Sequence, residues 1–127
     1  MNWKTEKRIL LVEDNAKGEF FKDYLSEIQG LNVDWSVDVD DAWGLANTHD
    51  YDLFILDVMM PLSDDSILYK DQQRYNLKNE FGMFTGLLLL IKLQLEIGCK
   101  RDFKTILFTA RGQQQVDIEL ESLKVGV

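Results

Sequence analysis

Two short apolar runs of this chain each end in acidic residues. Leu53–Leu56 is followed by Asp57, and Ile9–Val12 is followed by Glu13 and Asp14. Apolar runs of this length, stopped by polar residues, are typical of buried strands in a parallel sheet. In an open α/β sheet ligands bind beyond the carboxyl ends of the strands, so neighbouring strands would place the three carboxylates in one pocket. Three crowded carboxylates repel one another, which favours a bound hard cation and a site that handles phosphoryl groups.

The composition indicates one folded domain. The chain has 127 residues, of which 46% are hydrophobic, enough for one core and too few for two. A net charge of −8 argues against a nucleic-acid-binding surface. The one cysteine, Cys99, excludes an internal disulfide and suits a reducing cytoplasm. No secretory signal is visible, and the most apolar stretch, Leu87–Ile97, is too short to span a membrane. We therefore expect a cytoplasmic domain that binds neither nucleic acid nor membrane.

Strand and helix patterns alternate along the chain. The predicted strands are Arg8–Val12, Val33–Val37, Leu53–Leu56 and Thr105–Phe108. The predicted helices are one capped by Asp14-Asn15 and stopped by Gly30, one capped by Asp40-Asp41, one at Gly86–Ile97, and a last one carrying Val116, Leu120 and Leu123. This alternation predicts an α/β fold with a parallel, doubly wound sheet. Helix 86–97 has more apolar surface than one sheet face can cover, so another element should pack on it.

A mostly polar segment, residues 63–82, separates the third predicted strand from helix 86–97. We interpret this segment as an inserted loop or short helix rather than a further domain. It carries three aromatic residues, Tyr69, Tyr75 and Phe81. We expect their side chains to cover the apolar helix, and the alternative is that they form a partner surface.

Three segments together resemble a response-regulator receiver domain. They are Leu10–Asn15, Tyr51–Pro61 and Ile106–Arg111, in this order along the chain. The resemblance implies a flavodoxin-like, doubly wound parallel sheet of order 2-1-3-4-5, with the site between the first and third strands. Residues 1–127 would then be a single receiver domain, with an insertion at about 63–82 between the third strand and the third helix.

The resemblance also implies roles for individual residues. Asp57 would accept a phosphoryl group from a histidine kinase or a phosphotransfer protein. Glu13, Asp14, Asp57 and the backbone carbonyl of Met59 would hold Mg²⁺, which prefers near-octahedral oxygen ligands. Thr109 would supply the hydroxyl that moves to bond the phosphoryl oxygens. Phosphorylation would switch a surface read by a downstream protein. Such a domain is not an enzyme, although it assists its own phosphorylation and dephosphorylation.

The sequence departs from the receiver pattern in two places. A short turn with a glycine normally follows the Met-Pro pair, and here Met83–Leu87 resembles that turn on the far side of the insertion. Receivers also continue beyond the position of Val127 into a fifth strand, an active-site lysine and a fifth helix. Neither Lys104 nor Lys124 matches that lysine. We therefore expect a fold truncated before the fifth strand, with the fourth strand as an exposed edge that pairs with another chain in a dimer.

Two other functions compete with the phosphoacceptor. A phosphorylation-independent, receiver-like interaction module is favoured by the insertion and the missing lysine, and opposed by the intact acidic trio. An aspartate-nucleophile phosphohydrolase usually carries a second Asp two residues after the nucleophile, where this chain has Met59. One histidine, His49, and one cysteine give poor support for zinc sites or Cys-His catalysis. We interpret the tryptophans as packing residues rather than a ligand cage; they are Trp3, Trp35 and Trp43.

Overall fold

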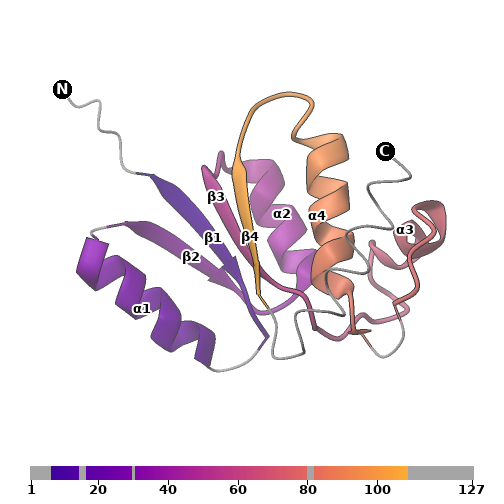
Figure 1. Cartoon of the computed structure of the whole chain (residues 1–127), viewed down its shortest axis with the longest axis horizontal. Coiled ribbons are helices and arrows are strands. Elements are labelled where there is room, and N and C mark those ends of the chain that lie inside the picture. The colour runs from indigo at the N-terminus through magenta and orange to yellow at the C-terminus, as the bar shows by residue number, and fades with distance from the viewer. Residues whose placement is uncertain (1–6, 15–16, 30, 80–81, 109–127) are drawn as a thin grey trace.

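The computed structural model describes residues 7–14, 17–29, 31–79 and 82–108. The elements, in chain order, are β1 (Arg8–Val12), α1 (Lys17–Gln29), β2 (Asn32–Ser36), α2 (Val39–Thr48), β3 (Leu53–Asp57), α3 (Tyr69–Arg74), α4 (Thr85–Glu96) and β4 (Lys104–Phe108) (Figure 1). All four predicted strands are present, and each begins or ends within one residue of its predicted position. The helices after β1, β2 and the 61–84 connection are present as well.

The four strands form one parallel sheet with the order β2-β1-β3-β4. Helix α1 lies on one face of this sheet, and α2 and α4 lie together on the other (Figure 1). The order reverses between β1 and β3, which places the topological switch point at the carboxyl ends of these two strands. The predicted flavodoxin-like order of the first four strands is therefore confirmed.

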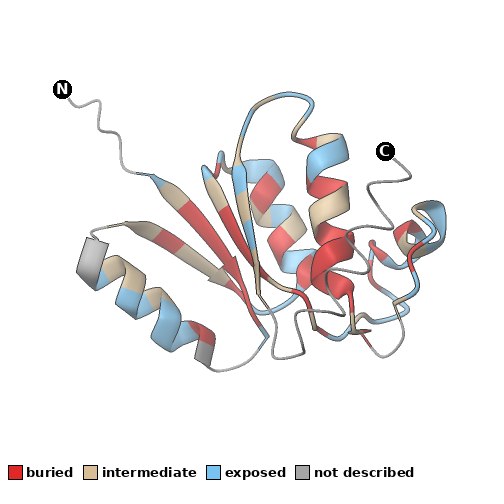
Figure 2. Cartoon of the chain, in the orientation of Figure 1, coloured by how far each residue is buried: buried red, intermediate tan, exposed pale blue. Residues whose placement is uncertain are grey.

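The core has two halves because successive side chains of a strand point to opposite faces of the sheet. Leu10, Val12, Phe54 and Leu56 are fully buried on the face that α2 and α4 cover. Ile9, Leu11, Val33 and Ile55 are buried on the face toward α1. Figure 2 shows the resulting band of buried residues along β1 and β3. The two strands that flank the switch point are thus packed on both faces of the sheet.

Two predicted details at the β2–α2 junction are wrong. Helix α2 is capped by Asp38, whose side chain accepts a hydrogen bond of 2.7 Å from the Asp41 N–H, and not by Asp40 and Asp41. Val37 follows the end of β2 and is 49% exposed, because Ser36 takes the inward position. The Ser36 hydroxyl lies 2.8 Å from the Asp38 carbonyl oxygen and 2.8 Å from an Asp41 carboxylate oxygen. Its single O–H is shared between these two acceptors, so the buried hydroxyl has hydrogen-bond partners.

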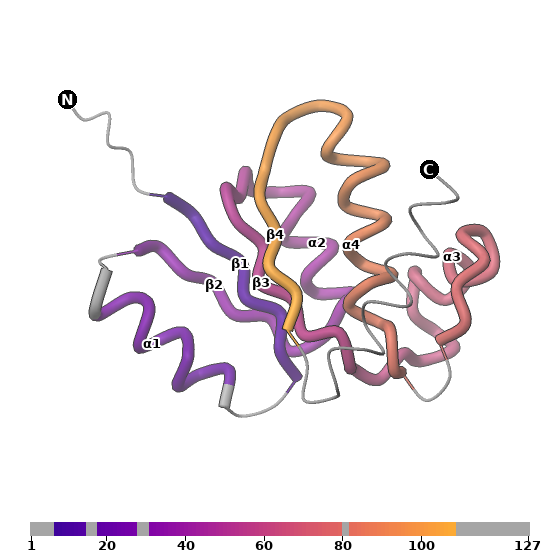
Figure 3. Tube along the Cα trace, in the orientation of Figure 1, coloured from indigo at the N-terminus to yellow at the C-terminus, as the bar shows by residue number. Residues whose placement is uncertain are grey.

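The chain between β3 and α4 makes an excursion that returns to its starting point (Figure 3). The Met60 N–H donates to the Gly82 carbonyl at 3.0 Å, so the two ends of the excursion are hydrogen-bonded. Gly82 has a φ of 74°, and a Cβ there would lie 2.9 Å from the Met60 carbonyl carbon, so this closure favours glycine. Loop closure costs little more for a long loop than for a short one, so such an excursion is compatible with the surrounding fold.

The excursion packs on α4, as the apolar surface of that helix predicts. Leu68 and Leu77 are buried in the same cluster as Leu88 and Leu89 of α4, and Tyr75 packs against this cluster. Helix α2 contacts α4 as well. Of the three aromatic residues expected to cover the helix, Tyr75 does so, Tyr69 is 36% exposed, and Phe81 lies outside the described residues.

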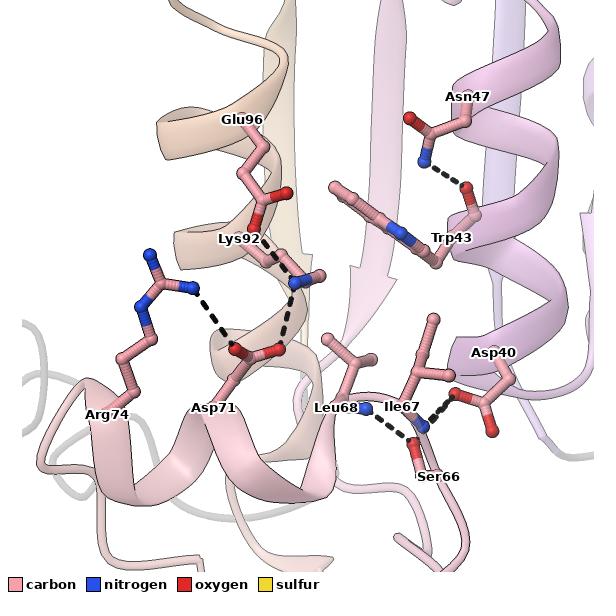
Figure 4. A network of polar contacts seen from close by, with 10 residues as sticks. All are labelled: Asp40, Trp43, Asn47, Ser66, Ile67, Leu68, Asp71, Arg74, Lys92 and Glu96. Carbon is pink, nitrogen blue, oxygen red and sulfur yellow. Dashed lines mark hydrogen bonds and ion pairs between the residues drawn. The ribbon is translucent and has the colours of Figure 1, made fainter.

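Polar contacts fasten the excursion at two points (Figure 4). Asp71 of α3, nearly buried, pairs with Lys92 of α4 at 3.0 Å. Lys92 also pairs with Glu96 at 2.8 Å and lies 4.8 Å from the centre of the Trp43 ring. At the second point, the Asp40 carboxylate accepts hydrogen bonds from the Ser66 hydroxyl and from the Ile67 N–H. Asp40 therefore connects α2 to the excursion by two hydrogen bonds.

Several expectations fall on residues that the structure leaves undescribed. They are the packing residue Trp3, the cap residue Asn15, the helix stop Gly30, the switch residue Thr109 and the last helix with Val116, Leu120 and Leu123. Within the described ranges β4 forms one edge of the sheet, and its Ile106 is 50% exposed. Dimer formation through this edge stays a prediction. No helix in the described part of the chain is long and apolar enough to cross a membrane.

Candidate functional site

Three carboxylates meet where β1 and β3 end. The two strands are parallel and in register, with Val12 opposite Leu56, so the residues that follow leave the sheet side by side. One carboxylate oxygen each from Glu13, Asp14 and Asp57 lies within 4.8 Å of the others. The structure thus brings together the acidic trio on which the sequence interpretation rests.

Asp57 is the partly buried member of the trio. Burial raises the pKa of the Asp57 carboxyl above its ordinary value, and the nearby Asp14 charge adds to the rise. Hydrogen bonds with the Glu13 side chain and from the Met59 N–H, the latter at 3.1 Å, oppose part of it. The Met59 bond reaches Oδ1 and so fixes the orientation of the carboxylate. Burial and the negative charge of Asp14 both disfavour the ionised form of Asp57, and a bound cation would stabilise that form.

Glu13 is held by β2 as well as by its own strand. It is 9% exposed, and its N–H donates to the Ser36 carbonyl at 3.0 Å. Its carbonyl accepts a hydrogen bond of 2.8 Å from the indole Nε1 of Trp35. Trp35 was predicted as a packing residue, and this hydrogen bond to Glu13 was not predicted. Gly18, whose missing side chain leaves room for the indole ring, was the available signal.

The start of α4 closes the other side of the site. The Gly86 N–H donates to the Val58 carbonyl at 2.9 Å. A Cβ on Gly86 would lie 2.7 Å from the Asp57 carbonyl carbon and 2.9 Å from the Val58 Cα, closer than real Cβ atoms approach. Gly86 stands in the first turn of α4, in agreement with the helix predicted at Gly86–Ile97. Only glycine permits the helix to begin this close to Asp57.

The donor set suits a hard divalent cation. Carboxylate oxygens are the ligands that Mg²⁺ and Mn²⁺ prefer, and no histidine or cysteine belongs to the trio. His49 caps the far end of α2 and lies beside Tyr51, before β3 begins. Asp14 is exposed, so an ion there would keep contact with solvent, as Mg²⁺ commonly does. The residues present therefore fit a magnesium ion.

Solved structures of similar fold include response regulators and their receiver domains. The Francisella response regulator 1452 receiver domain is 23% identical, with a TM-score of 0.63 over 93% of this chain and 78% of its own. A response regulator receiver protein from Pseudomonas putida is 16% identical, with a TM-score of 0.63 over 94% and 80%. The MaeR response regulator bound to beryllium trifluoride is 25% identical, with a TM-score of 0.57 over 95% and 80%. No family model and no curated protein matches the sequence. With the sheet order, these likenesses identify the fold of this chain as that of a response-regulator receiver domain.

Proposed function

We propose that this chain is a phosphoacceptor receiver domain in which Asp57 takes a phosphoryl group in a Mg²⁺-dependent reaction. The observation that carries the proposal is the meeting of Glu13, Asp14 and Asp57 at the switch point of a receiver fold. Glu13, Asp14, Asp57 and the Met59 carbonyl are the proposed ligands. When bound, Mg²⁺ would neutralise charge on the transferring group.

The chain's own residues prepare the nucleophile. The Met59 N–H binds Oδ1 of Asp57 and orients the carboxylate, and the other carboxylate oxygen is the one that we propose to attack phosphorus. A new O–P bond forms as the bond between phosphorus and the donor breaks, and the donor keeps that electron pair. The product is an acyl phosphate, which water can hydrolyse to restore Asp57. The acidic neighbours would hold the cation in place, and their negative charge would repel an anionic phosphoryl donor when no cation is bound.

The donor that we propose is the phosphohistidine of a histidine kinase or phosphotransfer protein. MaeR supports the acceptance of a phosphoryl group, because beryllium trifluoride is an analogue of that group and binds a protein of the same fold. Thr109, which follows β4, is the proposed switch hydroxyl that would carry the change to a downstream protein. This role classifies the chain as a signalling domain and not as an enzyme.

We also propose that residues 63–82 are an insertion within one domain that spans residues 1–127. The hydrogen bond that joins Met60 to Gly82 supports this view, because removal of the excursion would leave two ends already in contact. The position of Gly86 against Asp57 supports it further, since the site continues directly from β3 to α4. The insertion would then brace the site without contributing a ligand.

Intact-mass spectrometry of the full chain after incubation with acetyl phosphate and Mg²⁺ tests the function. We expect a gain of one phosphoryl group that EDTA blocks. Asp57→Asn should abolish the gain, whereas Asp65→Asn, at an exposed carboxylate of the excursion, should leave it unchanged. No gain in the unmodified chain would overturn the proposal and favour a phosphorylation-independent interaction module on the same fold.

A further inference from the structure

Trp35 connects β2 to the acidic end of β1. Its indole packs against the core cluster on the α1 face and is only partly buried. Its Nε1 donates a hydrogen bond of 2.8 Å to the carbonyl of Glu13, which directly follows the neighbouring strand β1. An indole has one N–H and no acceptor, so this bond uses its whole polar capacity.

The Trp35 bond completes a two-sided grip on Glu13. On one side the Glu13 N–H donates to the Ser36 carbonyl, and on the other the Glu13 carbonyl accepts from Trp35. The carbonyl of Glu13 belongs to the peptide plane that also contains the N–H of Asp14. A fixed plane restricts the torsion on either side of it and therefore the directions in which both carboxylates leave the chain.

Gly18 provides the seat for the indole ring. A Cβ on Gly18 would lie 2.6 Å from Cε2 and 3.0 Å from Cζ2 of Trp35. The ring thus lies directly on the backbone of the first turns of α1, where any side chain would displace it. The indole is thus held between the Glu13 carbonyl and the backbone of α1 at Gly18, so its N–H has little freedom to leave that carbonyl.

From these contacts we infer that Trp35 is a positioning residue for the metal site, which it serves through the Glu13–Asp14 peptide without touching the ion. The inference rests on the proposed function, because it concerns the affinity of the acidic trio for Mg²⁺. Groups that orient metal ligands from outside commonly change metal affinity by about 10- to 100-fold when they are removed. We expect Trp35 to belong at the lower end of that range, since it acts through a backbone carbonyl.

Isothermal titration of the full chain with Mg²⁺ tests this role. Trp35→Phe keeps an aromatic ring and removes the N–H, and we expect the dissociation constant for Mg²⁺ to rise about tenfold. Gly18→Ala should raise it as well, because the new Cβ displaces the indole. Trp43→Phe is the matched control: Trp43 lies on α2 beside Lys92, away from the trio, and its loss should leave the affinity unchanged.

A second measurement needs no variant that has to fold. In ¹H–¹⁵N spectra of the unmodified chain, the indole N–H signal of Trp35 should shift on titration with Mg²⁺, and that of Trp43 should not. If Trp35→Phe lowers only the unfolding temperature and keeps the affinity of the unmodified chain, or if the Trp35 signal does not move, the positioning role is wrong. If the unmodified chain binds no Mg²⁺ at all, the proposed function fails and takes this inference with it.

Discussion

Gly86, at the start of α4, stands directly against the backbone of Asp57, at the end of β3. The two residues are far apart in sequence and are separated by an excursion that closes on itself between Met60 and Gly82. A hydrogen bond from the Gly86 N–H to the carbonyl of Val58, the residue after Asp57, holds the two segments together. The acidic trio thus follows β1 and ends β3, and the first turn of α4 packs against the backbone of Asp57.

Substitution of Gly86 tests this close approach. In Gly86→Ala the new Cβ would overlap the Asp57 carbonyl, so α4 must shift, and we expect a loss of about 2 kcal/mol in the free energy of unfolding. Gly44→Ala is the matched control within α2, where a Cβ meets nothing within 4 Å. That variant should gain up to about 1 kcal/mol from helix propensity. Urea denaturation measures both, and equal effects at the two glycines would contradict the contact.

The ion pair between Lys92 and Asp71 holds the excursion on α4, and its two side chains are only 11% and 7% exposed. Lys92→Met leaves the Asp71 carboxylate buried with only the mostly exposed Arg74 beside it, at 3.8 Å. We expect this variant to lose about 3 kcal/mol in the free energy of unfolding, as removal of one partner of a buried pair does. Chemical denaturation provides the measurement.

Two further variants test whether the stability lost in Lys92→Met comes from the broken ion pair or from the loss of a lysine side chain as such. In the double variant Asp71→Leu with Lys92→Met no charge is stranded, and most of the stability should return. Lys100→Met, at an exposed lysine, should change the free energy by no more than about 0.5 kcal/mol. A loss in Lys92→Met no larger than in Lys100→Met would show that the pair does not hold the excursion.

The buried hydroxyl of Tyr51 should make the stability of the chain decrease at alkaline pH. Its side chain is fully buried, and its hydroxyl donates to Asp34 at 2.6 Å. Burial, followed by the bond to Asp34, raises the Tyr51 pKa above its ordinary value of 10.0. The folded chain therefore keeps a proton that the unfolded chain loses. The stabilisation is complete below about pH 10 and declines as the pH rises above that value.

Tyr51→Phe removes the titrating hydroxyl, and with it both the pH dependence that it adds to the stability and the hydrogen bond to Asp34. At about pH 8 the variant should be less stable than the unmodified chain by about 1–2 kcal/mol. The difference should narrow above about pH 10, because only the unmodified chain loses the Tyr51 contribution there. Tyr24→Phe, at an exposed tyrosine, should follow the unmodified chain at every pH. A difference between Tyr51→Phe and the unmodified chain that stays constant over urea titrations from about pH 8 to 11 would contradict the assignment.

The sequence was sufficient to predict the sheet and the meeting of the acidic residues, because both follow from local patterns. Apolar runs that end in Glu13 and Asp57 specify buried parallel strands, and the carboxyl ends of such strands share one edge. The roles of Asp40 and Trp35 were not predictable in this way. Asp40 binds Ser66, and Trp35 binds Glu13. The two residues of each pair are more than 20 positions apart in the sequence and meet only in the folded chain. No periodicity of the sequence encodes a contact of that kind.

The most direct test of the account is to locate the phosphoryl group within the chain. An acyl phosphate reacts with borohydride to give a homoserine residue at the modified aspartate. After treatment with acetyl phosphate and Mg²⁺, followed by borohydride, peptide mass spectrometry of the full chain should find homoserine at position 57. Homoserine at another aspartate, or at none, would contradict the assignment of Asp57 as the phosphoacceptor.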